Sequence, residues 1–216
     1  MKTMQQPMLL YLAVLYTLLV LSSGQSSSKC SSGEKRVQSE TRLVSNGCSK
    51  PPGIDIAGEE NFTYCCDRHD ACYESCGSSR DYCDKEFSKC MRQLCDTAFS
   101  HNKQCKSAAE MYFMGVNLFG QGGFEDSQDQ HCTCIEASKV NEHYVYLVKD
   151  FYDTHVTTTK TEGEVKALVE GKGGNIKRLA MLVFSLYKKY GHAIEYNSER
   201  AKQTAVSPRP TISKEL

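Results

Sequence analysis

The segment Cys65–Cys72, which reads Cys-Cys-Asp-Arg-His-Asp-Ala-Cys, contains the residues of this chain best suited to chemistry. It places His69 directly before Asp70, and a histidine that is oriented by a carboxylate can act as a general base. Asp70 points about 100° away from His69 around a helix, so it cannot be the orienting carboxylate. It can instead hold a hard, oxygen-ligated cation such as calcium beside the base. Because the chain has no serine in a G-x-S-x-G elbow, water is the expected nucleophile.

Two helices are expected to position these residues. In Glu59–Cys76 the larger side chains recur at three- and four-residue steps, the spacing of one helix face. They are Phe62, Cys65, Cys66, His69, Cys72, Tyr73 and Cys76. Gly77 supplies the left-handed residue that commonly ends a helix, and Ser78 or Ser79 can cap a second one. The helical spacing then continues through Tyr82, Phe87, Cys90, Met91 and Leu94. Since the connection is short, the two helices should be antiparallel.

The cysteine positions fit such an antiparallel pair. Residues at one level of an antiparallel hairpin have a nearly constant sum of positions, and Cys72 with Cys83 has the same sum as Cys65 with Cys90. Both pairs could therefore bridge the two helices, with two helical turns, about 10.5 Å, between the bridges.

Asp84 lies at nearly the level of His69 in this arrangement. A carboxylate beside the imidazole would fix its tautomer and stabilise the imidazolium. The alternative is a purely structural histidine, which is the commoner role of a lone histidine among cysteines. The irregular segment 45–53, which contains Gly and Pro, is a source of backbone carbonyls for a cation at Asp70.

Residues 1–24 have the features of a secretory signal peptide. Lys2 precedes the apolar stretch Met8–Leu21, and small residues follow at 22–24. The alternative is a membrane anchor, but these fourteen apolar residues fall short of the ~20 that span a bilayer. The protein is therefore expected to be secreted.

The cysteines agree with export. All twelve lie between Cys30 and Cys134, and a dense, even set in an exported chain predicts a disulfide framework. A zinc cluster among the crowded residues 65–76 is the alternative. Zinc sites use spaced pairs of ligands, however, and no second pair is present.

The formal net charge of zero hides an asymmetry. Residues 25–137 contain 12 basic and 17 acidic side chains, whereas residues 138–216 contain 13 basic and 9 acidic ones. The acidic part argues against nucleic-acid binding, and the basic part leaves a membrane surface as a partner.

The cysteine-free segment 138–216 has one clear element, an amphipathic helix at Asn175–Tyr190. Its candidate membrane contacts are the basic residues of one arc, Lys177, Arg178, Lys188 and Lys189. Such a helix can lie in a membrane interface. The preferred interpretation is that it packs on the core and leaves its basic face to solvent. The chain from Asn197 on is expected to be disordered.

The segment Cys65–Cys72 resembles the C-C-x-x-H-D-x-C active-site signature of the secreted phospholipase A2 family. Cys83–Cys90 is similar to the second helix of that family, in which an aspartate directly follows a half-cystine. The segments that look most like the group XII branch are 46–49, 72–77 and 132–134.

The resemblance implies an all-α, disulfide-rich fold of two long antiparallel, disulfide-linked helices with a calcium loop. The expected organisation is a signal peptide at 1–24, a phospholipase A2-like domain at 25–137 and a helical or disordered extension at 138–216.

The same resemblance implies the site. His69 would be the base that deprotonates water, Asp84 its orienting partner and Asp70 the carboxylate ligand of calcium. The other calcium ligands would be the backbone carbonyls of Gly47, Ser49 and Pro51. The implied disulfides are Cys48–Cys66, Cys65–Cys90 and Cys72–Cys83.

The reaction implied is calcium-dependent hydrolysis of the sn-2 ester of a glycerophospholipid at a membrane surface, which yields a lysophospholipid and a free fatty acid. A catalytically silent scaffold that binds a membrane or a receptor is the alternative. The loop departs from the family, since Ser49-Lys-Pro-Pro follows Cys48 where glycines are usual, and proline restricts the backbone. Asn61-Phe-Thr63 is a glycosylation sequon.

Overall fold

A computed structural model describes residues 30–40, 42–48, 50 and 55–196. The expected signal peptide, the expected calcium ligands Ser49 and Pro51, and the chain from Asn197 on lie outside the described residues. Helices dominate the described part, and six disulfides cross-link it. The prediction of an all-α, disulfide-rich fold is confirmed.

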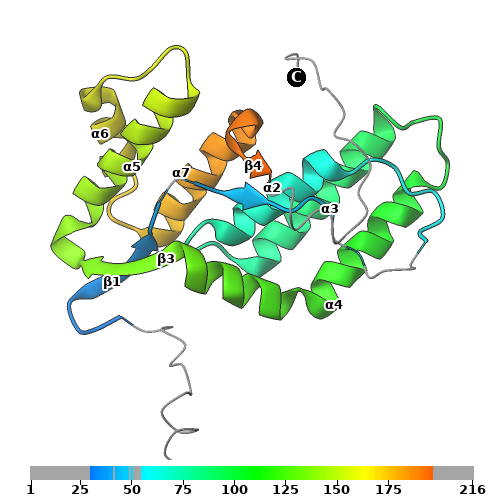
Figure 1. Cartoon of the computed structure of the whole chain (residues 1–216), viewed down its shortest axis with the longest axis horizontal. Helices are drawn as coiled ribbons and strands as arrows, with labels where there is room; N and C mark the ends of the chain where they lie inside the picture. The colour runs from blue at the N-terminus through cyan, green and yellow to red at the C-terminus, as the bar shows by residue number, and fades with distance from the viewer. Residues whose placement is uncertain (1–29, 41, 49, 51–54, 197–216) are drawn as a thin grey trace, which may run out of the picture.

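The centre of the fold is the antiparallel pair of helices α2 (Thr63–Glu74) and α3 (Arg80–Asp96) (Figure 1). Gly77 lies between them with a φ of 85°, the left-handed conformation that glycine adopts without strain. Helix α2 begins later than the predicted Glu59, because Asn61 forms a local turn in which its side-chain oxygen accepts from the Thr63 backbone N–H.

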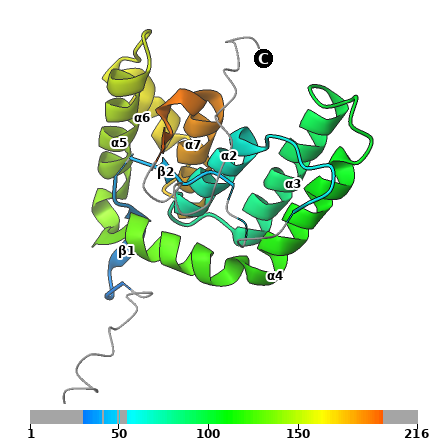
Figure 2. The same ribbon diagram turned by 45° about the vertical axis from the view of Figure 1, so that its right-hand side comes forward.

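The third long helix, α4 (Cys105–His131), is not anticipated by the sequence analysis. Its first residue forms a disulfide with Cys95, so that α4 returns antiparallel to α3 and packs along it (Figures 1 and 2). Its helical pattern is weak because glycines interrupt it and large apolar side chains point outward. Helix α4 covers one side of the α2–α3 pair.

The described part of the fold also contains two short, two-stranded sheets. Strand β1 (Glu34–Gln38) pairs antiparallel with β3 (Cys132–Glu136), and β2 (Val44–Ser45) pairs in parallel with β4 (Glu195–Tyr196). Disulfides tie the first sheet to its surroundings, since Cys30 bonds to Cys134 and Cys76, after α2, bonds to Cys132.

The C-terminal extension is folded as far as the structure describes it. It comprises η1 (Ala137–Lys139), α5 (Val140–His155), α6 (Glu162–Glu170), α7 (Ile176–Lys189) and η2 (Gly191–Ala193). Thr161 and Glu164 form a capping box at the start of α6, and the Asn175 side chain caps α7. The extension contains more helix than the single one predicted.

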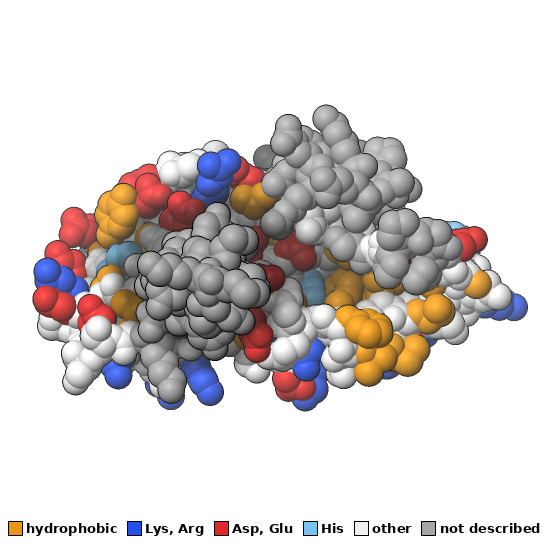
Figure 3. Space-filling model, turned by 60° about the horizontal axis from the view of Figure 1, so that its bottom comes forward, with side chains coloured by type: hydrophobic (Ala, Val, Ile, Leu, Met, Phe, Trp, Pro, Cys, Tyr) orange, Lys and Arg blue, Asp and Glu red, His pale blue; other side chains and the backbone are white. Residues whose placement is uncertain are grey.

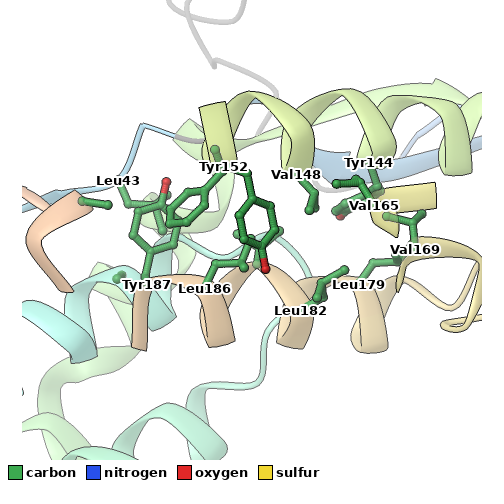
Figure 4. Close-up of a cluster of buried hydrophobic side chains, with 14 of the residues drawn as sticks. Leu43, Tyr144, Val148, Tyr152, Val165, Val169, Leu179, Leu182, Leu186 and Tyr187 are labelled. Carbon is green, nitrogen blue, oxygen red and sulfur yellow. The ribbon is translucent and has the colours of Figure 1, made fainter. Parts of the chain in front are cut away.

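Helix α7 lies between α5 and α2, and its apolar face is buried (Figures 1 and 4). Figure 4 shows Leu179, Leu182, Leu186 and Tyr187 of α7 facing apolar residues of α5 and α6. The same cluster contains Val37, Leu43 and Ala71 from before the extension. The extension therefore shares an apolar cluster with these residues of the cysteine-rich part, while a second cluster lies among α2, α3 and α4. Among the described helices, none is long and apolar enough to cross a membrane.

Candidate active site

The site begins with the pair of His69 on α2 and Asp84 on α3. The His69 Nε2 and Asp84 Oδ1 atoms are 2.8 Å apart. Both side chains are buried, with 7% and 3% of their surfaces exposed. The disulfides Cys65–Cys90 and Cys72–Cys83 join the two helices on either side of this pair. These cross-links hold the imidazole and the carboxylate in register.

Tyr73 is a second partner of Asp84, and sequence analysis assigns it no role in the site. Its hydroxyl donates to the same Oδ1 atom over 2.7 Å. Burial, together with the neighbouring Asp84, raises the pKa of Tyr73 well above its ordinary value, so the hydroxyl stays protonated and remains a donor. Tyr73 follows His69 by one helical turn, and this spacing is the signal that could have identified it.

Arg80 provides the third contact of Asp84. Its Nη1 lies 3.7 Å from Asp84 Oδ2 and donates to the backbone oxygen of Asn117 on α4 over 3.0 Å. Burial raises the pKa of Asp84, but hydrogen bonds from His69 and Tyr73 and the charges of His69 and Arg80 outweigh it and hold the pKa below its ordinary value. Asp84 is therefore ionised at neutral pH.

Aromatic rings surround the imidazole. The His69 ring centroid is 4.1 Å from that of Tyr73 and 4.7 Å from that of Phe87. These contacts exclude water from the side of His69 that faces Asp84, and they limit rotation of the ring.

Asp70 lies on the adjacent face of α2, as expected from the helical turn. Its Oδ2 accepts from Ser45 Oγ over 2.9 Å and from the backbone N–H of Asn46 over 3.2 Å. The disulfide Cys48–Cys66 fixes the same loop to α2. The loop backbone thus lies beside the Asp70 carboxylate. Together with Cys65–Cys90 and Cys72–Cys83, this disulfide completes the three pairings that the family resemblance implies.

His69 and Asp70 line a common cavity of about 300 Å³. Its described lining includes Asn46, Gly47 and Cys48 from the loop, residues 112, 116 and 123 from α4, and no lysine or arginine. Three carboxylates line it, those of Asp70, Glu74 and Asp126. The cavity is therefore a place where the field favours a cation over an anion.

The carboxylates that line this cavity are donors of the kind that a hard cation prefers. Within the described residues no cluster of three or more His, Cys, Asp or Glu side chains is arranged as a metal site. A calcium ion here would accordingly need the Asp70 carboxylate together with backbone oxygens of the loop. Gly47 lies in that loop, is buried and has a φ of 75°. The other two carbonyls expected as ligands lie outside the described residues.

The remaining candidates lie away from this cavity. All four basic residues of α7 are exposed. Lys188 pairs with Glu86 of α3, and Lys189 lies over the Tyr190 ring. Asn61 is half-buried at the start of α2, where its glycosylation stays a prediction.

Comparison with known proteins gives consistent relatives. The family model for the group XII secretory phospholipase A2 precursor matches residues 5–142. The group XIIA secretory phospholipase A2 of Mus musculus is 36% identical over 141 residues, which cover 61% of this chain and 73% of the relative. The Homo sapiens protein of the same name is 34% identical over 141 residues, covering 61% and 75%.

A shorter match is to conodipine-P3 of Conus purpurascens, which is 42% identical over 64 residues, 28% of this chain and 35% of the relative. No solved structure gives a significant match. The family match contains the whole site described above and ends within α5, so most of the extension lies beyond it. The chain belongs to the group XII secretory phospholipase A2 family.

Proposed function

We propose that this protein is a secreted, calcium-dependent phospholipase A2 that hydrolyses the sn-2 ester of glycerophospholipids. The observation that carries the proposal is the buried His69–Asp84 hydrogen bond at the edge of an acidic cavity that also contains Asp70. Membership of the family and an oxidised set of twelve cysteines support an extracellular enzyme of this kind.

The geometry gives each nitrogen of His69 a role. Ionised Asp84 can only accept a hydrogen bond, so Nε2 of His69 carries the proton and Nδ1 is left as the base. Nδ1 takes a proton from water while the oxygen of that water bonds to the ester carbonyl carbon. The imidazolium, stabilised by Asp84, then gives the proton to the departing glycerol oxygen as the ester C–O bond breaks.

Calcium would be held by Asp70 and by backbone oxygens of the loop, including Gly47. When bound, the ion supplies Lewis-acid polarisation of the ester carbonyl. The loop itself is positioned by the Cys48–Cys66 disulfide and by its hydrogen bonds to Asp70.

Helix α4 supplies a surface for the lipid aggregate. Met111, Met114, Leu118 and Phe119 are 45%, 53%, 71% and 82% exposed. Figure 3 shows hydrophobic side chains gathered on the face of the molecule that carries α4. The same helix lines the cavity through Tyr112, Val116 and Gly123. A bilayer seated on this face would lie at the cavity mouth, whereas the apolar face of α7 is already buried.

The first experiment measures fatty-acid release from vesicles labelled at the sn-2 chain, using the oxidised protein from residue 25. Release should require calcium and stop with a chelator. We expect His69→Gln to lower the rate by roughly 10²–10⁴-fold, the range that a general base contributes. His101→Gln, which changes an exposed histidine, is the matched control and should retain full activity. Folded protein that binds vesicles without releasing fatty acid would establish the silent scaffold instead.

A second variant tests the lipid-facing surface. Leu118→Ser with Phe119→Ser should weaken vesicle binding and leave hydrolysis of a short-chain, monomeric substrate unchanged. Tyr146→Ser removes a ring of α5 that is 67% exposed, and it should alter neither vesicle binding nor hydrolysis. Vesicle binding that is unaffected by the α4 double variant would exclude this face as the contact.

A further inference from the structure

A second cavity of about 340 Å³ lies between α2, α3 and α7. It shares His69 and Phe87 with the first cavity, but neither Asp70 nor any residue of the loop lines it. Its volume is at the lower end of the ~300–1,000 Å³ that small-molecule sites occupy. One wall comes from Phe184 and Lys188 of α7, beyond the residues that match the family.

The charge of this cavity is opposite to that of the first. Arg68, Lys89 and Lys188 line it, and Glu86 is its one carboxylate among the described lining residues. Glu86 forms an ion pair with Lys188 and lies 4.0 Å from Lys89 Nζ. A single carboxylate cannot neutralise three cations, so the cavity retains an excess of positive charge that favours an anion.

Arg68 is the least exposed of these three cations. Its guanidinium carbon lies 3.9 Å from the centroid of the Tyr64 ring, and its Nη2 donates to the Lys188 backbone oxygen over 2.6 Å. Its Nε is buried and has no hydrogen-bond partner within the described residues. Burial lowers the pKa of Arg68, and the neighbouring Tyr64 acts in the opposite direction. A guanidinium beside a cavity favours an anion there, because hydrogen bonds between charged groups are stronger than those between neutral ones.

The rest of the lining is largely apolar. Phe87, Leu94 and Phe184 contribute hydrocarbon surface, and so does the disulfide Cys65–Cys90. Cationic groups beside an apolar cavity wall match a ligand that has an anionic head and one hydrocarbon chain.

We propose that the cavity between α2, α3 and α7 binds a single-chain lipid with an anionic headgroup. The proposed reaction supplies a fatty acid of this chemistry, and a lysophospholipid phosphate is the other source. The binding itself requires no hydrolysis, so the proposal stands or falls separately from the proposed function. Because α7 closes the cavity, the extension would give this chain a lipid site that the family-matched residues alone do not complete.

The test is equilibrium dialysis of the full oxidised protein with dodecanoate, dodecyl phosphate and dodecanol, each below its micelle concentration. We expect the better of the two anions to bind at least tenfold more tightly than dodecanol, since a charged hydrogen bond contributes about that factor. Tighter binding of dodecanoate assigns the site to fatty acids, and tighter binding of dodecyl phosphate assigns it to lysophospholipids. Equal binding of dodecanol would overturn the proposal. None of these probes contains a carboxylic ester, so failure of the vesicle assay would not affect the result.

Variants locate the binding on the protein. Arg68→Gln should weaken the preferred anion about tenfold. Lys89→Gln should weaken it several-fold, and because Lys89 is 75% exposed its replacement does not threaten folding. Arg92→Gln is the matched control, because Arg92 lies on α3 with Lys89 but does not line the cavity, and it should not change the affinity for the anion.

Photolabelling with a diazirine analogue of the preferred anion separates this cavity from the apolar face of α4. Label on residues of α3 and α7 that line the cavity is the expected result. Label confined to the exposed residues of α4, or an affinity that neither Arg68→Gln nor Lys89→Gln alters, would refute the proposal.

Discussion

At the scale of single residues, Asp84 is the most constrained group of the site. It accepts from His69 and Tyr73 through one oxygen and lies near Arg80 through the other. These contacts favour the ionised carboxylate more than burial disfavours it, so its pKa lies below the ordinary value. The consequence reaches stability as well as catalysis, because a depressed pKa links folding to pH.

We expect the acid stability of the protein to depend on Asp84. A carboxyl group whose pKa is lower in the folded state stabilises the fold above its unfolded pKa, and this contribution is lost as pH falls through the folded pKa. The free energy of unfolding should therefore decline as the pH falls below the ordinary value of 3.8, and decline less in Asp84→Asn. Urea unfolding at about pH 6 and about pH 3, with disulfides intact, measures how the free energy of unfolding changes with pH in the unchanged protein and in Asp84→Asn. The same pH dependence in both proteins would contradict a lowered pKa of Asp84 in the folded state.

Gly120 of α4 lies against the Tyr73 hydroxyl. A Cβ atom at residue 120 would lie 2.7 Å from that oxygen, closer than real Cβ atoms come to a neighbour. Gly120→Ala should push Tyr73 away from Asp84, lower the hydrolysis rate and cost about 1–3 kcal/mol of stability through overpacking. The cost should largely vanish in a Tyr73→Phe background, where the hydroxyl is absent.

The matched control for Gly120 is Gly122→Ala in the same helix. A Cβ at Gly122 meets nothing within 4 Å, so this change should be neutral or stabilising by up to ~1 kcal/mol. Additive effects of Gly120→Ala and Tyr73→Phe in a double-mutant cycle would show that the two residues do not interact.

At the scale of elements, the C-terminal end of α2 is the junction of the fold. Gln128 of α4 donates to the Tyr73 backbone oxygen over 2.6 Å, and its Oε1 accepts from the Gly77 N–H over 2.8 Å. Gln38 of β1 accepts from the Cys76 N–H over 2.7 Å. Two buried amide side chains thus satisfy backbone groups that a helix end leaves unpaired, and they attach α4 and β1 to it.

Gly77→Ala should destabilise this junction for two separate reasons. The residue has a φ of 85°, and a Cβ there would lie 2.8 Å from Ile176 Cγ2 at the start of α7. We expect a loss of about 1–3 kcal/mol in the free energy of unfolding, measured with urea. Gly163→Ala, in α6 with no neighbour within 4 Å, is the control and should not destabilise. A neutral Gly77→Ala would mean that α7 is not held against this turn.

At the scale of the whole molecule, the extension and the cysteine-rich part are joined by packing rather than by cross-links. The described cysteines all lie before residue 135, yet residues 37, 43 and 71 belong to the same apolar cluster as α5, α6 and α7. Two buried tyrosines of that cluster differ in their hydrogen bonding. The Tyr144 hydroxyl accepts from the Gln38 N–H over 3.2 Å, whereas the Tyr187 hydroxyl has no partner within the described residues.

This contrast predicts opposite results for the same chemical change. Tyr187→Phe removes an unsatisfied buried hydroxyl and should be neutral or slightly stabilising. Tyr144→Phe leaves the buried Gln38 N–H without this acceptor and should lower the free energy of unfolding by about 1–3 kcal/mol. Thermal unfolding of both variants measures the difference, and a larger loss in Tyr187→Phe would contradict the shared core.

Local sequence patterns predicted the central part of the fold. Helical spacing and the turn at Gly77 predicted the α2–α3 hairpin, and equal position sums brought Cys65, Cys90, Cys72 and Cys83 together, because these features depend on neighbours in the chain. The same arithmetic put Asp84 at the level of His69, and the structure has the two atoms in hydrogen-bond contact.

Contacts between distant segments were decided only by tertiary structure. Helix α4 was not predicted, because its glycines weaken the helical pattern and several of its apolar residues face outward. Phe119 is an example of such an exposed residue. The approach of Gly120 to Tyr73, the anchoring role of Gln128 and the cavity beside Arg68 each join elements far apart in sequence. A sequence determines the period of a helix because that period is local, but which face of the helix meets which partner depends on packing the whole chain at once.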